Sequence, residues 1–366
     1  MGYKSKKIKI ALVYPMRESH WVSCQTIRKN ILAAYEKAFE PGQLFHIAQP
    51  IDYATSVQSI REIVELRPDK IIFVDHSPHP IGFLESIKEN WVGRGFPEIY
   101  FHVYGDFTLF SKEWQRTDKL LRGHALRFIC ASEKQRKLVS RFLTEPAQNE
   151  VSVCPFPVDA GYFRSDSTLR ASWRERLKLK PDEIAITYAG RISLQKNLHL
   201  MLGELERFSV ERSNLKLKIF IAGEFDEISA PFFGIHFKAG RYFRIFKDYF
   251  EGLRPEFRSQ ISFLGNLLAS DLVGLFNATD IYSCLGLYHD EDFGMAPAEA
   301  MSCGALAILS DWGGFSSFAD KSGHCQLVPV RIGEQGLEFS RTAFLDSIIL
   351  QTEKSQDNSS RDERSL

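Results

Sequence analysis

Short apolar runs alternate with longer helical stretches along this chain, and the alternation limits the folds that are open to it. In the first half, strands are expected at residues 9–14, 44–48, 70–75, 98–104, 127–131 and 151–154. Helical periodicity lies between them, for example over residues 21–39, where Ile27, Ile31 and Tyr35 fall on one face. Strands that alternate with helices predict an α/β fold whose parallel sheet is covered on both faces.

The alternation then restarts, with strands expected at residues 184–189, 217–222, 261–264, 280–284 and 305–309. A polar stretch, residues 164–182, separates the two series. We therefore predict one domain over residues 1–164 and a second over residues 165–352. Doubly wound domains bind ligands at the carboxyl ends of their strands, so the cleft between the two domains is the expected site. Residues 353–366 are almost entirely polar and are predicted to be disordered.

Composition excludes several classes of protein. Lys plus Arg (46) equals Asp plus Glu (46), which gives no electrostatic reason to expect a nucleic-acid partner. Six cysteines are scattered without a Cys-x-x-Cys pair, as in reduced proteins that lack a zinc site or disulfide framework. No apolar stretch approaches the ~20 residues of a transmembrane helix, and the run at residues 8–14 is too short for a signal peptide. We expect a cytoplasmic protein whose membrane contact, if any, is peripheral.

Residues 285–314 carry the most informative pattern. A strand is expected to end near Leu285, and an acidic loop follows at residues 289–294. A helix should then begin near Pro297 and end at Gly304, because proline suits the first helical turn and glycine follows the last. The helix dipole and the backbone N–H groups at its start would attract an anion such as a diphosphate. Those N–H groups belong to Gly294, Met295 and Ala296.

Two glutamates flank the expected helix start. Glu299 is about one turn into the helix, where it could accept hydrogen bonds from a ribose diol. Glu291 lies in the loop, where it could reach sugar hydroxyls or the reaction centre. Such a pair is by itself most often two solvated carboxylates, and Glu299 could simply favour the first helical turn electrostatically. The Phe293-Gly294 pair, the proline and the Glu-Ala-Met run around them favour a functional site.

Glu291 and Glu299 match the Glu-x7-Glu motif of retaining glycosyltransferases with the GT-B fold, and Phe293 and Gly294 between them match as well. The chain resembles glycosyltransferase family 4 of those enzymes. The resemblance implies two Rossmann-like domains facing across a cleft, with the nucleotide-sugar donor bound by the C-terminal domain. It also implies metal-independent, hexosyltransferase-like chemistry on a UDP-, GDP- or ADP-sugar without a cofactor. The acceptor is unidentified and could be a glycan, a lipid-linked sugar or a protein.

The segment from Gly190 and Arg191 to Lys196 resembles the family's Gly-Arg…Lys segment, which assigns both cations to the donor diphosphate. Two fixed cations can stabilise the charge that develops on a leaving nucleoside diphosphate without a metal. Alone they would be ordinary surface charges, but their place after a strand and a glycine favours the phosphate role. Weaker matches follow in family order at residues 69–78, 130–133, 155–159 and 263–265, and Gly265 ends the segment that borders the nucleotide base.

The N-terminal domain departs from the family pattern. The glycine-rich turn that commonly follows the first strand is absent from residues 14–20, where Arg17 is a candidate replacement. The family's fourth strand usually ends in a His beside an acidic or Gly-Asp pair, and that His lines the acceptor side of the reaction centre. Alignment on the pair that contains Asp106 puts Tyr104 in its place, with His102 two residues earlier on the same strand face. His102, Tyr104 and Asp106 are all catalytic candidates, and a structural role for His102 stays open.

Two later segments bear on the membrane and on the architecture. Residues 232–250 combine bases with an aromatic helical stripe that includes Tyr242, Phe246 and Tyr249. The stripe fits either an interfacial helix or, as is more usual, a face packed into the core. Residues 342–350 are the last helical candidate, so the helix with which many relatives return to the N-terminal domain is not evident.

Two other functions stay open. A non-catalytic protein that binds a nucleotide sugar would keep the fold, although the intact pairs Glu291/Glu299 and Arg191/Lys196 argue against it. A GT-B epimerase or phosphorylase would share the architecture, but a phosphorylase is normally far longer and carries a pyridoxal-phosphate lysine. A nicotinamide-linked dehydrogenase is disfavoured, because no Gly-x-Gly-x-x-Gly follows any expected strand.

Overall fold

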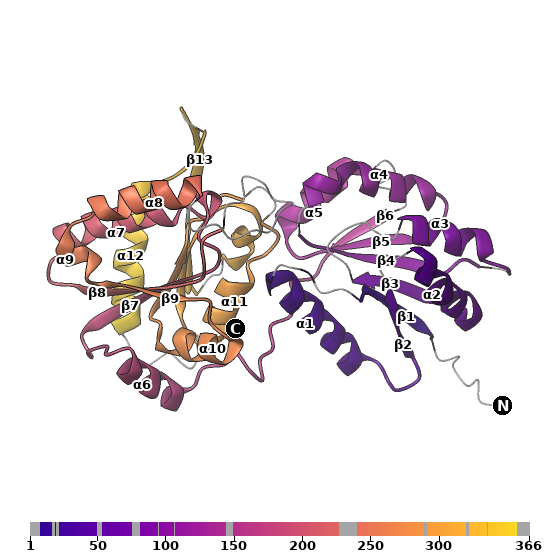
Figure 1. Ribbon diagram of the computed structural model, residues 1–366, viewed down its shortest axis with the longest axis horizontal. Coiled ribbons are helices and arrows are strands. Elements are labelled where there is room, and N and C mark those ends of the chain that lie inside the picture. The colour runs from indigo at the N-terminus through magenta and orange to yellow at the C-terminus, as the bar shows by residue number, and fades with distance from the viewer. Residues whose placement is uncertain are drawn as a thin grey trace. The chain divides into compact units, whose positions relative to one another are not determined.

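The protein consists of two compact units, unit 1 (Met1–Pro157) and unit 2 (Val158–Leu366). Each is built on its own six-stranded parallel sheet flanked by helices (Figure 1). The predicted pair of parallel-sheet domains is therefore confirmed. The computed structural model describes residues 8–16, 19, 22–49, 53–74, 81–93, 95–105, 107–143, 149–226, 240–288, 291–319, 322–334 and 336–356.

Unit 1 has the strand order β2-β1-β3-β4-β5-β6. The strands are β1 Ile10–Pro15, β2 Leu44–Gln49, β3 Lys70–Val74, β4 Glu98–Val103, β5 Leu126–Cys130 and β6 Asn149–Val153. The helices are α1 Val22–Ala38, α2 Tyr53–Leu66, α3 Ile81–Asn90, the 3₁₀ helix η1 Phe107–Phe110, α4 Ser111–Leu120 and α5 Glu133–Phe142. Each strand expected from the apolar runs is present, with ends that differ by one or two residues.

An aromatic stack holds the centre of the first sheet. Phe73 of β3 pairs in register with Phe101 of β4, which pairs with Phe128 of β5. Their ring centroids are 4.9 and 5.8 Å apart, and Trp114 of α4 packs edge-on against Phe101. A slip of one residue would turn these rings to the opposite face, so the stack specifies the register of three strands.

Unit 2 has the strand order β12-β11-β10-β7-β8-β9. The strands are β7 Glu183–Ala189, β8 Lys216–Ala222, β9 Ile261–Gly265, β10 Ile281–Cys284, β11 Leu306–Ser310 and β12 Cys325–Val328. The helices are α6 Ser167–Arg176, η2 Leu194–Lys196, α7 Leu198–Glu211, α8 Arg241–Gly252, α9 Pro255–Arg258, α10 Ala269–Ala278, α11 Met295–Ser302, η3 Gly313–Phe318 and α12 Arg341–Gln356. An antiparallel hairpin, β13 Val330–Gly333 and β14 Gly336–Phe339, projects from the unit (Figure 1).

The chain passes from one unit to the other earlier than the polar stretch at residues 164–182 suggested. The division falls between Pro157 and Val158, and α6 inside that stretch belongs to unit 2. Helix α6 packs on α10, with its buried Trp173 against Gly274, and its Arg170 and Arg174 reach the buried Asp280. A helix that binds through charged groups has the composition of a linker, which is why the sequence placed the boundary later.

The last helix is longer than residues 342–350. Helix α12 continues to Gln356, so residues 353–356 of the expected disordered tail are helical, and residues 357–366 lie outside the described part. It packs on β10, β11, β12 and α7 of unit 2. Its buried face includes Gln351, whose Nε2 donates to the carbonyl oxygens of Gly323 and His324 at 3.1 and 3.2 Å. Buried polar side chains of this kind leave no apolar periodicity to detect, and strand β12 and the hairpin were likewise not predicted.

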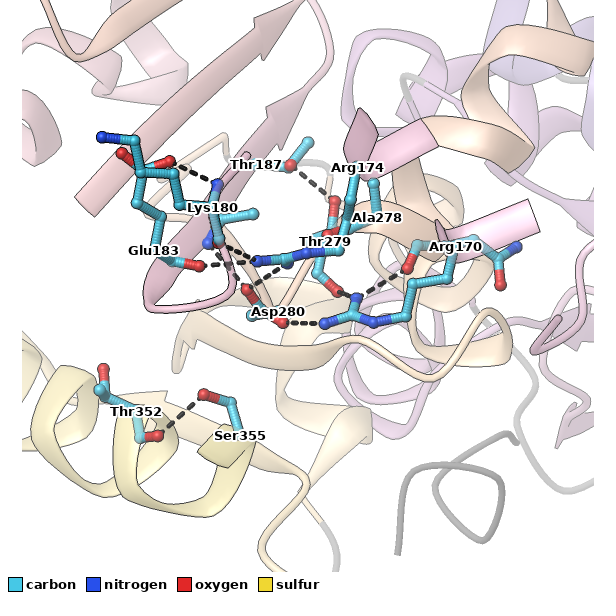
Figure 2. A network of polar contacts seen from close by, with 12 residues as sticks. Arg170, Arg174, Lys180, Glu183, Thr187, Ala278, Thr279, Asp280, Thr352 and Ser355 are labelled. Carbon is cyan, nitrogen blue, oxygen red and sulfur yellow. Dashed lines mark hydrogen bonds and ion pairs between the residues drawn. The ribbon is translucent and has the colours of Figure 1, made fainter. Parts of the chain in front are cut away.

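A buried carboxylate joins three parts of unit 2. Asp280, just before β10, lies 2.5 Å from Arg170 Nη2 and 2.9 Å from Arg174 Nη1, both on α6, and accepts a 2.8 Å hydrogen bond from the N–H of Ala185 in β7 (Figure 2). Arg174 also donates to the carbonyl oxygen of Glu183 at 2.8 Å. Burial by itself would raise the pKa of Asp280, but the two arginines and the N–H outweigh burial and lower it. We call Asp280, Arg170 and Arg174 the Asp280 cluster.

We expect Asp280→Asn to lower the free energy of unfolding by about 3–5 kcal/mol, because it leaves two buried guanidinium groups without their anion. Urea denaturation followed by circular dichroism measures this loss. The matched control is Asp182→Asn, which removes a carboxylate of unit 2 whose ion pair with Lys216 is exposed. The control should keep the wild-type midpoint. Equal midpoints for wild type and Asp280→Asn would contradict the role of the cluster.

Candidate functional site

Most candidate residues of unit 2 lie on the loops that follow β7 and β10, or on helix α11, which begins where the second loop ends; Gly265 ends β9. The loop after β7 covers residues 190–197, the loop after β8 covers residues 223–226, and the loop after β10 runs from residue 285 to residue 294. Because β10, β7 and β8 are parallel neighbours, their carboxyl ends lie along one edge of the sheet, and the loops leave from that edge. Loops at this edge of a sheet are where doubly wound domains bind ligands.

The loops after β7 and β8 approach each other through glycine. Gly223 has φ +141°, and a Cβ placed there would lie 1.9 Å from the carbonyl oxygen of Gly190. Only glycine permits this approach, which brings the two backbones into a short extension of the ladder. The N–H of Ile192 donates to the carbonyl oxygen of Glu224 at 2.8 Å, and the N–H of Asp226 donates to the carbonyl oxygen of Ile192 at 3.0 Å. The N–H and the carbonyl oxygen of Ile192 are therefore both bound to the loop after β8.

Arg191 is held by a buried acid that sequence reasoning did not single out. Its Nη1 lies 3.0 Å from Oδ2 of Asp226, whose residue is only 2% exposed. The carbonyl oxygen of Arg191 accepts a 2.5 Å hydrogen bond from the hydroxyl of the buried Tyr188. The sequence signal for Asp226 is its place in the loop after β8, two residues after the pair Gly223-Glu224.

Lys196 and Glu291, both predicted site residues, form an ion pair. The Lys196 Nζ lies 2.5 Å from Glu291 Oε2, and both side chains are mostly buried. The loops that carry them are tied together, since Leu287 N–H donates to the carbonyl oxygen of Gln195 at 2.8 Å. Asn197 has the left-handed conformation (φ +53°), and its Nδ2 donates to the carbonyl oxygen of Leu285 at 3.1 Å. The structure therefore brings together residues that are 95 positions apart.

Two glycines that carried no predicted role shape the Glu291 loop. Gly313 (φ +53°) and Gly314 lie against its backbone, and a Cβ at either would come within 2.6 Å of the Glu291 or Asp292 carbonyl oxygen. The N–H of Gly314 donates to the carbonyl oxygen of Glu291 at 2.5 Å. A side chain at either glycine would displace the loop, so the two glycines allow the backbone position that Glu291 has here.

Helix α11 begins at Met295, with Gly294 in a positive-φ conformation (φ +109°) before it. A Cβ on Gly294 would lie 2.6 Å from the Phe315 ring, so the position requires glycine. Phe293 packs on Phe318 with ring centroids 4.9 Å apart. The N–H groups of Met295 and Ala296 belong to the first turn, which has no acceptors within the helix. The predicted helix start is therefore present, and anion binding by its N–H groups stays a prediction.

Glu299 is the most unusual titratable group of the site. It is 7% exposed, and burial raises the pKa of its carboxyl from 4.5 to about 8. No residue in the described part of the chain forms an ion pair with it. A buried carboxyl of this kind is largely protonated at neutral pH and needs hydrogen-bond donors before it can ionise.

Two of the candidates of unit 1, His102 and Tyr104, lie in its interior. His102 is 7% exposed, and its Nε2 is 2.9 Å from the hydroxyl of Tyr35 on α1. Burial lowers the pKa of His102 to about 4, so the imidazole is neutral at pH 7. Tyr104 is 2% exposed and packs edge-on against Phe156. Asp106 and Arg17 lie outside the described residues. The catalytic roles of this set stay predictions.

Two further predicted features of unit 2 are Gly265 and the aromatic residues of α8. Gly265 ends β9 with φ +67°, and its carbonyl oxygen accepts a 2.8 Å hydrogen bond from Gly223 N–H. On α8, Tyr242 and Phe246 are buried around Phe225, which confirms the core interpretation for these two residues, whereas Tyr249 is partly exposed. Residues 232–239 of that stretch lie outside the described part.

The described residues contain no group of three or more His, Cys, Asp or Glu side chains that could hold a metal ion. None of their helices is both long and apolar enough to cross a bilayer.

Residues 170–328, from α6 to β12, match the family described as Glycosyl transferases group 1. The match contains every candidate residue of unit 2. A search of curated proteins found no match.

Solved structures of similar fold extend over both units. HepE of Anabaena in complex with UDP has a TM-score of 0.68 at 14% identity, over 98% of this chain and 96% of that one. A glycosyltransferase from Rickettsia africae has a TM-score of 0.64 at 16% identity, over 95% and 89%. An α,α-trehalose-phosphate synthase from Burkholderia vietnamiensis has a TM-score of 0.64 at 9% identity, over 98% and 92%. The two parallel-sheet units therefore adopt the GT-B fold.

The raised pKa of Glu299 gives a testable pH dependence. The folded protein binds the Glu299 proton more tightly than the unfolded chain, so Glu299 makes stability fall as pH rises from about 4.5 to about 8. We expect Glu299→Gln, which has no proton to lose, to gain stability relative to wild type over this range. The gain should be on the order of 2–5 kcal/mol, since each pKa unit corresponds to about 1.4 kcal/mol.

Urea midpoints at pH 5, 7 and 8.5 measure the effect. Glu256→Gln, on a solvent-facing turn of the same unit, is the control and should follow the wild-type curve. Parallel curves for wild type and Glu299→Gln would show that Glu299 ionises normally in the folded protein.

Proposed function

We propose that this protein is a retaining glycosyltransferase, of the family 4 type, that moves a sugar from a nucleoside-diphosphate sugar to a glycan, lipid-linked sugar or protein. The observation that carries the proposal is the meeting of Lys196 with Glu291 on loops at the carboxyl edge of the second sheet. Arg191 precedes Lys196 on the first of these loops, and Glu299 follows Glu291 on the helix after the second. All four lie in the segment that matches Glycosyl transferases group 1.

The chemistry of these groups suits a nucleotide sugar. Arg191 and Lys196 would bind the diphosphate, and the first turn of α11 would add N–H donors from Gly294, Met295 and Ala296. Glu299 would accept hydrogen bonds from the ribose hydroxyls, which would stabilise the charged form of its buried carboxyl. The loop that ends at Gly265 would border the base. Structures of HepE contain UDP and UDP-glucose, which supports a UDP-sugar as the first donor to test.

Glu291 is paired with Lys196, which is also one of the two cations proposed to bind the diphosphate. A diphosphate offers Lys196 a more highly charged partner, and its arrival would release the Glu291 carboxylate toward the sugar hydroxyls. Diphosphate binding and sugar contact would then be coupled through one lysine.

Transfer of the sugar would depend on stabilising the negative charge of the leaving diphosphate, and it would need no side-chain nucleophile. The bond between the anomeric carbon and the β-phosphate oxygen breaks, and negative charge develops on the leaving diphosphate beside Arg191 and Lys196. The acceptor oxygen bonds to the anomeric carbon on the face that the leaving group vacates. Its proton passes to the departing β-phosphate. The two cations would take the part that a metal ion plays in other enzymes, without a further cofactor.

We expect Arg191→Ala and Lys196→Ala each to lose about 2–4 kcal/mol of transition-state stabilisation, roughly 30- to 1,000-fold in kcat/KM, because each removes a preorganised charge contact. Release of UDP from UDP-glucose by the purified protein is the assay, with GDP- and ADP-sugars tested in parallel. Lys216→Ala, which removes an exposed cation of the same unit, should keep wild-type turnover. Unchanged turnover in Arg191→Ala would remove the phosphate assignment.

The two glutamates should separate kinetically. Glu299→Gln should act mainly on donor KM, because the ribose is bound alike in ground and transition states. Glu291→Gln should keep donor affinity within a few-fold and lower kcat. Product NMR should give the anomeric configuration of the donor. An inverted product would overturn the mechanism, and a pure KM effect at Glu291 would overturn its assigned role.

A further inference from the structure

Asp226 is a buried carboxylate at the edge of the candidate site, on the loop after β8. It is 2% exposed, and its Oδ2 lies 3.0 Å from Arg191 Nη1. Lys196, the other cation, is paired with Glu291 of the acidic loop. The two proposed phosphate-binding cations thus have carboxylate partners on different loops, and only the partner of Arg191 is buried to this degree.

The backbone fixes Asp226 relative to Arg191 independently of their side chains. Ile192, next to Arg191, forms a parallel bridge with Phe225, next to Asp226. The N–H of Asp226 donates to the carbonyl oxygen of Ile192 at 3.0 Å. The close approach of Gly223 to Gly190 lies just before this bridge. Both side chains therefore start from a single piece of ladder, and a shift of one backbone would shift the other.

Aromatic packing anchors the same loop to α8. The ring of Phe225 lies 4.9 Å from that of Phe243 and 5.1 Å from that of Phe246, measured between centroids. Tyr242 completes the cluster at 6.5 Å. A carboxylate whose neighbour is packed in this way has little freedom to follow a moving arginine. The arginine must instead conform to the carboxylate.

We propose that Asp226 is a positioning residue for Arg191, which holds the guanidinium plane in the orientation that binds the donor diphosphate. A guanidinium is planar and presents its N–H groups in a fixed fork, so one bond from Nη1 to a rigid carboxylate orients the rest. The side-chain entropy of Arg191 is then lost on folding and not on ligand binding. The inference rests on the proposed function, because it assigns a role toward the donor of that site.

Charge alone makes the opposite prediction. A carboxylate beside a phosphate site repels the ligand, so a purely electrostatic Asp226 would weaken nucleotide binding, and its removal would tighten it. A positioning Asp226 strengthens binding through Arg191, and its removal would weaken binding only while Arg191 is present. The sign of the effect and its dependence on Arg191 therefore separate the two roles.

The experiment is a titration of the full chain with UDP by isothermal calorimetry, in wild type, Asp226→Asn, Arg191→Ala and the double variant. We expect Asp226→Asn to weaken UDP binding about 10- to 100-fold, the size of effect that follows from misplacing a binding group by about 1 Å. In the Arg191→Ala background, Asp226→Asn should cause no further loss, because the interaction it supports is already gone.

Glu204→Gln is the matched control for the loss of a buried carboxylate. Glu204 lies on α7 of the same unit, is buried, and pairs with Arg207 and Arg341 at 3.7 and 3.3 Å. It should destabilise the protein as Asp226→Asn does, by thermal unfolding, and leave UDP affinity unchanged.

If Asp226→Asn does not fold, Arg191→Lys tests the proposal instead, because it leaves Asp226 and the other buried residues unchanged. Lysine keeps the charge and lacks the planar fork, so its affinity for UDP should fall close to that of Arg191→Ala.

Three results would overturn the positioning role. These are UDP affinity in Asp226→Asn equal to or above that of wild type, an equal loss in the Arg191→Ala background, and wild-type affinity in Arg191→Lys. If wild type binds none of UDP, GDP and ADP, the proposed function fails and this inference fails with it. If wild type binds UDP and any of the three results is found, the proposed function stands and only the role of Asp226 falls.

Discussion

The candidate site of unit 2 depends on the Asp280 cluster at the opposite end of its sheet. Asp280 binds two arginines of α6 and the N–H of Ala185, which fixes the start of β10 against the start of β7. The two strands then run in parallel register, with Ile281 beside Ile186. Because both begin from one polar cluster, their carboxyl ends deliver the Arg191 and Glu291 loops to the same edge. Burying an ion cluster carries a desolvation penalty. It also leaves few alternative registers for the two strands, because any slip would leave a buried charge without its partner.

In the candidate site, each of the two proposed phosphate-binding cations is paired with a carboxylate. The Arg191–Asp226 pair rests on a backbone ladder and an aromatic cluster, whereas the Lys196–Glu291 pair joins two loops through their side chains and neighbouring backbone contacts. Under the proposed function, a diphosphate would share Arg191 with a fixed acid and compete with Glu291 for Lys196. Affinity would then depend on how easily the second pair opens, and orientation on how firmly the first pair is held.

Much of this architecture could be predicted because it depends on local patterns. Buried parallel strands are apolar on both faces, so each expected strand was found, and the glycines and proline around α11 mark its start. Contacts between distant segments could not be predicted. Asp226 meets Arg191 only because Gly223 and Gly190 allow two loops to touch, and no spacing in the chain encodes that approach. Helices α6 and α12 were misplaced or cut short because arginine, glutamine, threonine and serine occupy positions on their buried faces, where a pattern search expects apolar residues.

The two glutamates of one short motif lie in opposite environments. Glu291 has a cation 2.5 Å away, and Glu299, eight residues later, is buried with a pKa raised to about 8 and no ion-pair partner among the described residues. A buried carboxyl with a raised pKa can ionise when hydroxyl groups donate to it, because such bonds stabilise the charged form. A nucleotide that brings a ribose diol to Glu299 would therefore expel a proton as it binds. The same spacing thus supplies one carboxylate that is paired with a lysine and one buried carboxyl whose pKa is raised. Under the proposed function, environment and not residue type would separate their roles.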